Sequence, residues 1–200
     1  MLKFFRKTLV FSIIALTLQQ FSSCTLLKER RSYAPCELRL SSVENIRLSG
    51  VNVQNVNNVT GLSSKNAVRL IHSVSLNRFP LELTLNIETR NPNRRRATLS
   101  RLDWILFIDD IKMLEGTTHK HVSIPQNGGI ASFPINFTIN LKEVLKSKPA
   151  DALINFGLNL SDANNKPVRF TLRAKPYVNI NNVQIPYTDY LDIKTDFVSD

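Results

Sequence analysis

Cysteine is scarce in this chain, which has only two among its 200 residues. Two cysteines exclude a disulfide-stapled scaffold and a zinc or iron–sulfur site built from several thiolates. The sequence also lacks a GxSxG nucleophile motif, a phosphate-binding glycine loop, an HExxH zinc helix and a CxxC pair. These absences remove the motifs that most often carry catalysis. We therefore expect no enzymatic activity, no cofactor and no metal.

Composition and length predict one folded domain. Hydrophobic residues make up 42 % of the chain and charged residues 21 %, which is typical of a globular protein rather than a disordered one. A chain of this size buries roughly two-thirds of its unfolded surface, so it can form a core without covalent staples. The formal net charge of +10 invites a nucleic-acid interpretation, although composition alone does not separate that from general surface charge.

Long apolar runs are missing as well. Residues 8–18 form an apolar run of 11 residues, whereas a membrane-spanning helix needs about 20. The run follows a basic start (Lys3, Arg6 and Lys7), a pattern typical of an export signal. The sequence Phe21-Ser22-Ser23-Cys24 then resembles the lipobox of bacterial lipoproteins, with Phe21 in place of the usual leucine. The resemblance implies a signal peptide over residues 1–23 and acylation of Cys24; an ordinary cleaved signal and an uncleaved anchor are the alternatives.

Acylation of Cys24 has consequences for membrane attachment and for the second cysteine. Several acyl chains hold a protein firmly without a spanning helix, since each buried CH₂ adds about 0.8 kcal/mol. Residues 1–23 contain three basic and no acidic residues, so the remaining 177 residues carry a formal charge of +7. An acylated Cys24 leaves Cys36 unpaired, whereas a free Cys24 could form a disulfide with Cys36 in an oxidising compartment.

The residues after Cys24 indicate a cellular location and a tether. Thr25 stands where many lipoproteins of Gram-negative cells carry an Asp for inner-membrane retention. By this resemblance we expect an outer-membrane lipoprotein of the cell envelope, with a periplasm-facing domain favoured over a surface-exposed one. Residues 24–40 are expected to form the tether. Its basic residues either contact anionic headgroups, at about 1 kcal/mol each, or are simply solvated.

Most of the remaining chain alternates between apolar and polar residues, which predicts antiparallel strands with one wet face. The clearest run places Leu81, Leu83, Leu85 and Ile87 on one face. The same period occurs in Val51 and Val53; Leu102, Trp104, Leu106 and Ile108; Phe133, Ile135, Phe137 and Ile139; Phe156, Leu158 and Leu160; Phe170 and Leu172; and residues 177–180 and 191–197. Ile105 and Phe107 are apolar too, which predicts that their strand is covered on both faces.

Two segments have helical spacing instead. Residues 64–75 place Ala67, Leu70, Ile71 and Val74 on one side, with Ser63 or Ser64 as the N-cap. Residues 141–148 predict a second short helix that ends before Pro149. Turn signals separate the strands, at Asn91-Pro92-Asn93, Asp109-Asp110, Asn127-Gly128-Gly129, residues 164–167 and Asn181-Asn182. Short strands at this spacing predict an all-β sandwich over residues 41–200.

An ordered series of markers resembles the group 2 late embryogenesis abundant (LEA) proteins, also called the WHy domain. An alternating strand ends in Asn91-Pro92-Asn93, and Asp109-Asp110, Gly116, Ile124-Pro125, Asn127-Gly128-Gly129 and Phe133-Pro134-Ile135 follow in order. In this chain Asp110-Ile111 replaces the usual Asp-Gly of the family, and Phe133-Pro134-Ile135 replaces Val-Pro-Val. The match covers residues 43–193, including the ending Ile185-Pro186-Tyr187. It implies an immunoglobulin-like or fibronectin-like antiparallel sandwich, no enzymatic activity and a link to desiccation stress. Residues 64–75 are an insertion relative to the shortest members.

The Asn-Pro-Asn motif has a physical role of its own. Pro92 has a fixed φ and favours extended geometry at Asn91, so the strand continues to the turn. The amides of Asn91 and Asn93 suit hydrogen bonds to nearby backbone and tolerate unusual φ. We interpret Asn91, Pro92, Asn93, Gly116, Pro125 and Pro134 as structural rather than ligand-binding residues.

Three further groups of residues have side chains suited to binding or catalysis. His119 and His121 share one face if they lie on a regular strand, but a zinc site needs more ligands and His72 is distant in sequence. Asp109 and Asp110 form a carboxylate pair at a turn, where we expect both to face water. Arg94, Arg95 and Arg96 suit phosphate but lack the interleaved aromatics of a single-strand platform. We expect them to contact anionic lipid or a protein, or to aid solubility, and we expect no nucleic-acid partner because the export signal removes the protein from it.

Together these features predict a non-catalytic, lipid-anchored envelope protein. Its sandwich would bind a partner, a membrane surface or a labile client under stress. The alternative is a carrier of an apolar ligand such as a lipid, held in a groove between the sheets, for which the two-sided apolar strand at residues 104–108 leaves room. Close packing explains the same strand equally well.

Overall fold

The computed structural model describes residues 33–54, 56, 59–76, 78–160 and 168–195. In chain order the elements are β1 (Glu37–Leu48), β2 (Val51–Asn52), η1 (Val59–Gly61), α2 (Ser64–Ser75), β3 (Pro80–Asn91), β4 (Ala97–Ile108), β5 (Ile111–Ile124), β6 (Gly129–Asn140), α3 (Leu141–Val144), α4 (Ala150–Asn159), β7 (Phe170–Ile180), β8 (Val183–Ile185) and β9 (Leu191–Thr195). The expected signal peptide and Cys24 lie outside the described residues, as does the expected turn at residues 164–167.

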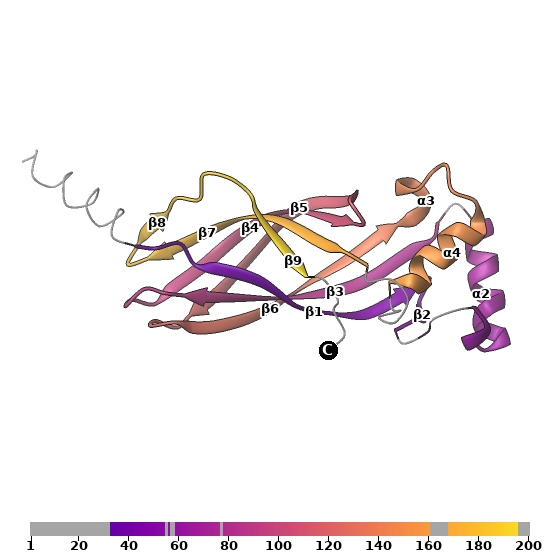
Figure 1. Cartoon of the computed structure of the whole chain (residues 1–200), viewed down its shortest axis with the longest axis horizontal. Coiled ribbons are helices and arrows are strands. Elements are labelled where there is room, and N and C mark those ends of the chain that lie inside the picture. Colours follow the sequence, from indigo (N-terminus) through magenta and orange to yellow (C-terminus); the bar gives the residue numbers. More distant parts are fainter. Residues whose placement is uncertain (1–32, 55, 57–58, 77, 161–167, 196–200) are drawn as a thin grey trace, which may run out of the picture.

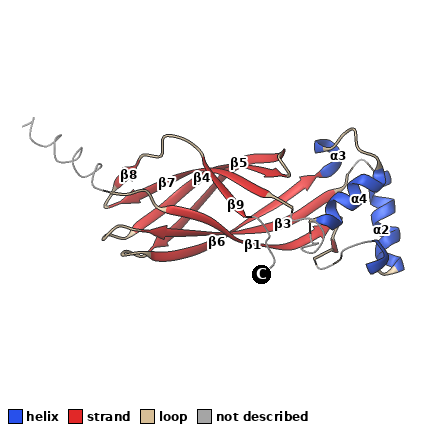
Figure 2. Ribbon diagram, in the orientation of Figure 1, coloured by secondary structure: helices blue, strands red, loops and turns tan. Residues whose placement is uncertain are grey.

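The strands form two antiparallel sheets that pack as a sandwich (Figure 1, Figure 2). One sheet has the order β2-β1-β3-β6. The other has the order β5-β4-β7-β8, and β9 pairs with the first half of β7. The predicted antiparallel β-sandwich is therefore confirmed. Its long strands run along the long axis of the molecule, with the helices gathered at one end (Figure 2).

Period-two alternation explains how the core forms. On β3, Leu81, Leu83, Leu85 and Ile87 are at most 2 % exposed, while the residues between them are only half-buried. Strand β6 pairs with β3 in unbroken register from Pro80 opposite Asn140 to Asn91 opposite Gly129, so both strands present one apolar face. These faces join those of the second sheet in one buried cluster.

Trp104 on β4 and Phe137 on β6 connect the two sheets. Their rings meet edge to face, with centroids 4.8 Å apart and an interplanar angle of 81°, a geometry that aromatic pairs prefer. On the outer side of β4, Ile105 and Phe107 are half-buried rather than buried. The expectation that this strand is covered on both faces is therefore wrong in degree, because its outer side keeps contact with solvent.

The helices occupy the end of the sandwich where β3 begins (Figure 1). Helix α2 has the predicted bounds, and the Ser63 hydroxyl accepts a hydrogen bond from the Asn66 amide as its N-cap. Helix α3 starts at Leu141 as expected but ends at Val144. The strand expected at Phe156, Leu158 and Leu160 is wrong, because residues 150–159 form helix α4.

The reason for this error lies in the buried residues of α4. Leu153, Ile154, Gly157 and Leu158 are buried, and their spacing of one, three and one residues is helical. Pro149 precedes the helix and Asp151 lies in its first turn, both of which are helix-start signals. Phe156 and Leu158 are both apolar and two residues apart, as in a strand, and this spacing obscures the helical pattern of the buried residues.

Strand β1 begins earlier than the sequence indicates. It starts at Glu37, so residues 37–40 of the expected tether belong to the sandwich. Its alternation is interrupted by register shifts between Leu40 and Ser42 and between Glu44 and Arg47. These bulges reverse the face on which side chains point, which is why no regular period marks the strand.

Three of the expected turns have the backbone that their residues favour. Asp109 and Asp110 both have positive φ, as do Asn181 and Asn182, and as do Asn127 and Gly128. The pairs at 109–110 and 181–182 form two-residue hairpins, which need this left-handed conformation to match the twist of their strands. Asn127 and Gly128 lie in the longer connection of residues 125–128, and Asn and Gly adopt the same conformation easily. The Val51 and Val53 prediction corresponds only to the two-residue strand β2.

Candidate functional site

The Asn-Pro-Asn turn is a buried polar network at the end of the sandwich opposite the helices. Asn91 is fully buried and Asn93 is 8 % exposed. The Asn91 Oδ1 accepts hydrogen bonds from the Asn93 backbone amide (3.0 Å) and from the Asn93 Nδ2 (2.9 Å). The Asn91 Nδ2 donates to the Arg95 carbonyl at 2.7 Å. The two amides thus stabilise the turn, as expected, and both keep negative φ.

Asn93 also holds the N-terminal segment of the described chain. Its Oδ1 accepts from the Ala34 amide and its Nδ2 donates to the Ala34 carbonyl, both at 2.9 Å. This reciprocal pair joins residues 59 positions apart. The sequence predicted local hydrogen bonds for Asn93 but did not predict this contact.

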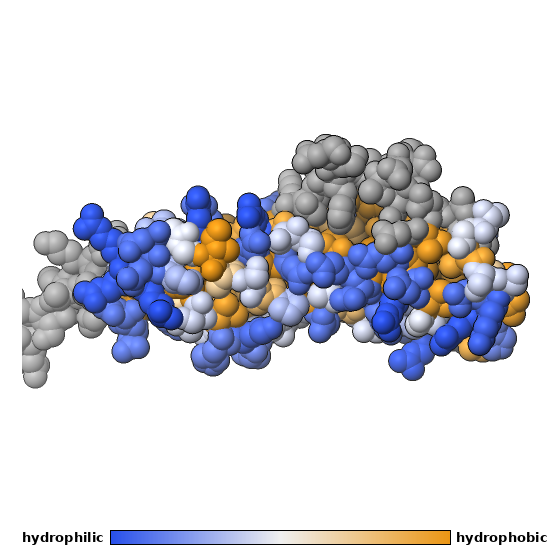
Figure 3. Space-filling view, turned by 90° about the horizontal axis from the view of Figure 1, so that it is seen from below, coloured by the Kyte–Doolittle hydropathy of each residue, from blue (hydrophilic) through white to orange (hydrophobic). Residues whose placement is uncertain are grey.

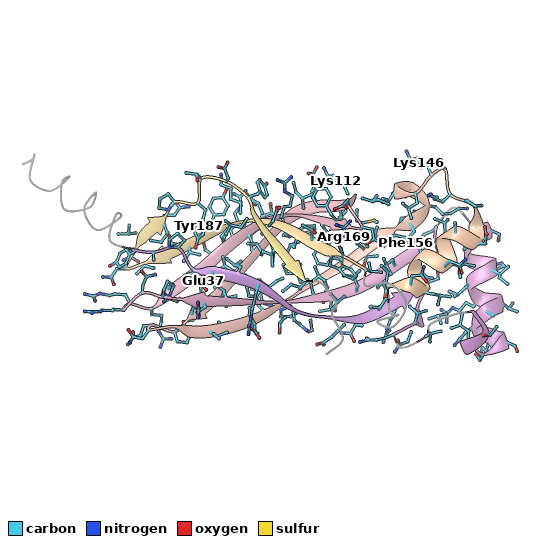
Figure 4. The ribbon with its side chains drawn as sticks, viewed as in Figure 1. Glu37, Lys112, Lys146, Phe156, Arg169 and Tyr187 are labelled. Carbon is cyan, nitrogen blue, oxygen red and sulfur yellow. The ribbon has the colours of Figure 1, made fainter. Side chains whose placement is uncertain are left out.

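Tyr187, in the loop between β8 and β9, holds the next residues. Its hydroxyl accepts a hydrogen bond from the Cys36 amide at 2.7 Å and donates to the Cys36 carbonyl at 3.2 Å. Figure 4 shows Tyr187 and Glu37 toward one end of the molecule, with Lys146 and Phe156 toward the other. Asn91, Asn93 and Tyr187 thus form what we call the N-terminal clamp, which holds residues 34–36 against both sheets.

Cys36 is buried inside this clamp, at 2 % exposure. Burial raises the pKa of its thiol to about 11, an effect that Glu37 reinforces and a hydrogen bond with Tyr187 opposes. Burial also raises the pKa of the Tyr187 phenol. At neutral pH the Cys36 side chain is therefore a protonated, inaccessible thiol.

Three exposed arginines follow the clamp directly. Arg94, Arg95 and Arg96 occupy the turn between β3 and β4. The Arg96 Nη1 donates to the Ser123 hydroxyl at 3.0 Å. Within the described residues none of the three forms an ion pair, whereas Arg90 nearby is paired with Glu37. The end of the sandwich that receives the N-terminal segment is thus cationic.

The other marker residues support strands and turns. A Cβ on Gly116 would lie 2.8 Å from the Trp104 Cζ2, so only glycine fits across from that indole. Pro125 packs against Gly129, where an added Cβ would lie 2.5 Å from the proline Cβ. Pro134 faces outward on β6, an edge strand, where a residue without an N–H is tolerated.

The structure does not bring the candidate chemical residues together. His119 and His121 are exposed on β5 beside a register shift, which interrupts the regular alternation they were expected to share. Asp109 and Asp110 are exposed, as expected, and both contact Arg169. No group of three or more His, Cys, Asp or Glu residues in the described ranges is arranged to hold a metal ion.

A shallow groove runs along the side of the sandwich near the helical end. Its volume is about 480 Å³. Residues from both sheets and from α3 line it: Arg78, Pro80, Met113, Leu114, Thr138, Ile139, Asn140, Glu143 and Val144. The groove lies where β3, β5, β6 and α3 adjoin.

None of the helices described in the structure is long and apolar enough to cross a lipid bilayer. The N-terminal apolar run lies outside the described residues.

The fold is that of an antiparallel β-sandwich protein. Comparison with known proteins and solved structures gives the following matches. No family model and no curated protein matches the chain. A solution structure described as a late embryogenesis abundant (LEA) protein aligns over 92 % of this chain and 85 % of that one, with 10 % identity and a TM-score of 0.38. A crystal structure from Archaeoglobus fulgidus covers 84 % and 98 %, with 9 % identity and a TM-score of 0.34. The ApaA protein from Bordetella pertussis covers 82 % and 94 %, with 11 % identity and a TM-score of 0.39.

Proposed function

We propose that this chain is a non-catalytic, lipid-anchored protein of the cell envelope, attached through Cys24, whose sandwich protects or binds a partner under stress. The observation that carries the proposal is the N-terminal clamp. Asn93 and Tyr187 hold residues 34–36 at two separate points. An anchor ten residues before Ala34 is therefore joined to a fixed point on the sandwich rather than to a loose end.

The positive charge beside the N-terminal clamp supports contact between this end of the domain and the anchoring membrane. Arg94, Arg95 and Arg96 lie at the same end as Ala34 and form no ion pair with a carboxylate of the described residues. Cations close to an anionic bilayer gain about 1 kcal/mol each. The acyl chains supply attachment, and the three arginines orient the domain with its helical end away from the anchoring membrane.

The proposed stress role rests on the ordered sequence markers that resemble group 2 LEA proteins. Asn91 and Asn93 use their side chains in hydrogen bonds within the protein, which supports a scaffold role for these two markers. A module whose marker residues maintain the fold presents its surface, rather than a cleft, to a partner or client. Thr25 favours the outer membrane, and we propose that the domain lies on its periplasmic face.

Fractionation of cells that produce the full chain tests the anchor. We expect the wild type to incorporate labelled palmitate and to sediment with the outer membrane. Cys24→Ala should abolish the label and leave the protein uncleaved, whereas Cys36→Ala, the matched control at the buried cysteine, should keep both label and location. A Cys24→Ala protein that is still labelled would refute lipid anchoring at Cys24.

Carriage of an apolar ligand is a second candidate, favoured by the side groove alone. Met113, Leu114, Ile139 and Val144 give it an apolar wall, and its volume of about 480 Å³ suits a single acyl chain. Native mass spectrometry of the full chain released from membranes tests this function. A co-purified lipid that Val144→Arg removes would support carriage, and a ligand-free spectrum would exclude it.

A further inference from the structure

Helix α2 carries apolar side chains that the fold does not bury. Val68 is 65 % exposed, Ile71 is 61 % exposed, and Leu76 directly after the helix is 50 % exposed. Val68 and Ile71 are the two most exposed large hydrophobic residues in the described chain. Leu70 and Val74 are buried on the other side, where α2 packs against α4. The helix therefore has one apolar face that serves the core and a second face without a partner among the residues that the structure describes.

The second face borders directly on basic residues. At about 100° per residue, positions three apart lie about 60° from each other around a helix. Ile71, Val68 and Lys65 thus follow one another around α2, and the exposed Arg69 lies beyond Lys65. We call Lys65, Val68, Arg69, Ile71 and Leu76 the α2 face. Figure 3 shows hydrophobic and hydrophilic side chains side by side at the helical end.

The charge on α2 and on the chain that flanks it has one sign. Residues 45–81 contain no Asp or Glu. Lys65, Arg69 and Arg78 are exposed, and no ion pair of the described residues involves them. An acidic lipid surface complements this charge, whereas an uncharged apolar partner would leave the cations unused.

We propose that the α2 face docks onto an anionic lipid bilayer. Val68, Ile71 and Leu76 enter the boundary between headgroups and acyl chains, while Lys65 and Arg69 contact the headgroups. Aliphatic residues beside Lys and Arg on one helix surface are the pattern of interfacial helices. Neither three aliphatic side chains nor two cations hold a protein firmly, so docking needs both.

The position of α2 gives this contact a direction. Strand β3 begins at Pro80 beside the helices and ends at Asn91 in the N-terminal clamp. Its 12 residues span roughly 40 Å at 3.3 Å per residue. A molecule attached to one bilayer through the residues before Tyr33 therefore presents the α2 face to a second, opposing bilayer. This docking does not depend on acylation of Cys24.

Vesicle capture tests the proposal. The full chain is inserted through its N-terminal region into phosphatidylcholine vesicles, and a second, fluorescent vesicle population is added. We expect capture of phosphatidylglycerol-rich vesicles and not of phosphatidylcholine vesicles. Val68→Ser with Ile71→Ser, and separately Lys65→Gln with Arg69→Gln, should each weaken capture by roughly tenfold, since both sets of contacts lie at the interface.

Two matched variants separate the α2 face from the rest of the surface. Ile130→Ser removes an aliphatic residue that is 50 % exposed on β6, and Arg94→Gln with Arg95→Gln and Arg96→Gln removes the cations of the opposite end. Both should capture as the wild type does. Equal capture of neutral vesicles, or undiminished capture by the Val68 and Ile71 variant, would overturn the proposal. So would a dimer in detergent that this variant dissociates, because the face would then belong to a second copy.

Discussion

The side-chain amide of Asn93 and the backbone of Ala34 form two reciprocal hydrogen bonds, each 2.9 Å long. Asn93 is in turn oriented by Asn91, whose Oδ1 accepts from both of its N–H groups. The turn between β3 and β4 thereby receives the chain that precedes β1. Because Tyr187 holds Cys36 from the other sheet, this N-terminal segment is fixed at two points.

Asn93→Ala should loosen the N-terminal segment. It removes both bonds to Ala34 and leaves Asn91 without its side-chain partner, so we expect a loss of about 1–2 kcal/mol of unfolding free energy. Hydrogen exchange at the Ala34 and Cys36 amides should speed up. Arg94→Ala, an exposed change in the same turn, is the control and should alter stability by less than about 0.5 kcal/mol. Unchanged exchange at Ala34 in Asn93→Ala would contradict the clamp.

The protein should lose stability in alkaline solution. Burial raises the pKa of Cys36 from 9.0 to about 11, and the pKa of Tyr187 is raised as well. The unfolded chain therefore releases these protons at lower pH than the folded chain, so unfolding free energy falls as pH rises from about 9 to 11. Chemical denaturation across this range should show the fall. Cys36→Ala should make it shallower, and an identical slope in the variant would contradict a buried, protonated thiol.

Gly116→Ala should disturb the only tryptophan. The new Cβ would lie 2.8 Å from the Trp104 Cζ2, so the indole or the strand has to shift. We expect a cost of about 1–3 kcal/mol and a change in tryptophan emission, which reports on Trp104 alone because the chain has one tryptophan. Gly128→Asn is the control, since its added Cβ meets nothing within 4 Å and asparagine tolerates positive φ.

Gly157→Ala tests the packing of α4 against Leu48. Alanine favours a helix by about 1 kcal/mol over glycine, yet its Cβ would lie 2.7 Å from both methyl groups of Leu48, which is fully buried. We expect the clash to win, with a net loss of about 1–2 kcal/mol. Thermal unfolding measures it. The double variant with Leu48→Ala should show less than the summed losses, because shortening Leu48 opens the space.

Arg94, Arg95 and Arg96 should be shielded by an anionic membrane. Trypsin cleaves after arginine, and an exposed turn with three of them is a ready site. In full-chain proteoliposomes we expect cleavage here to be slower with phosphatidylglycerol than with phosphatidylcholine alone, and the difference should vanish in high salt. Cleavage at Arg169, which is exposed on the opposite end, serves as the internal control. Equal rates at Arg94–Arg96 in both lipids would exclude headgroup contact.

Local patterns in the sequence predicted the elements that obey a single period. Strand β3 alternates without interruption, and α2 combines helical spacing with a Ser63 cap. The sequence pattern does not predict strand β1, because its two bulges break the alternation of apolar and polar residues. Helix α4 was misinterpreted because Phe156 and Leu158 imitate a strand, although Pro149 and Asp151 mark a helix start.

The clamp could be predicted only in part. Asn91 and Asn93 were recognised as structural, and Tyr187 as part of a resembling tail. Their meeting with residues 34–36 depends on how the two sheets stack, since Tyr187 and Cys36 are 151 positions apart. No local pattern carries information at that separation. The sequence did not predict the α2 face for the same reason. Ile71 follows the helical spacing of the core residues, and only the way α2 packs against α4 leaves its side chain exposed.

Intact-mass measurement of the protein extracted from membranes is the strongest test of lipid anchoring at Cys24. We expect a chain that begins at Cys24, lacks residues 1–23 and carries the added mass of acyl chains on that cysteine. Fragmentation should place the acyl mass on Cys24 and leave Cys36 as a free thiol. A mass that retains residues 1–23, or a disulfide between Cys24 and Cys36, would contradict a lipid-anchored protein.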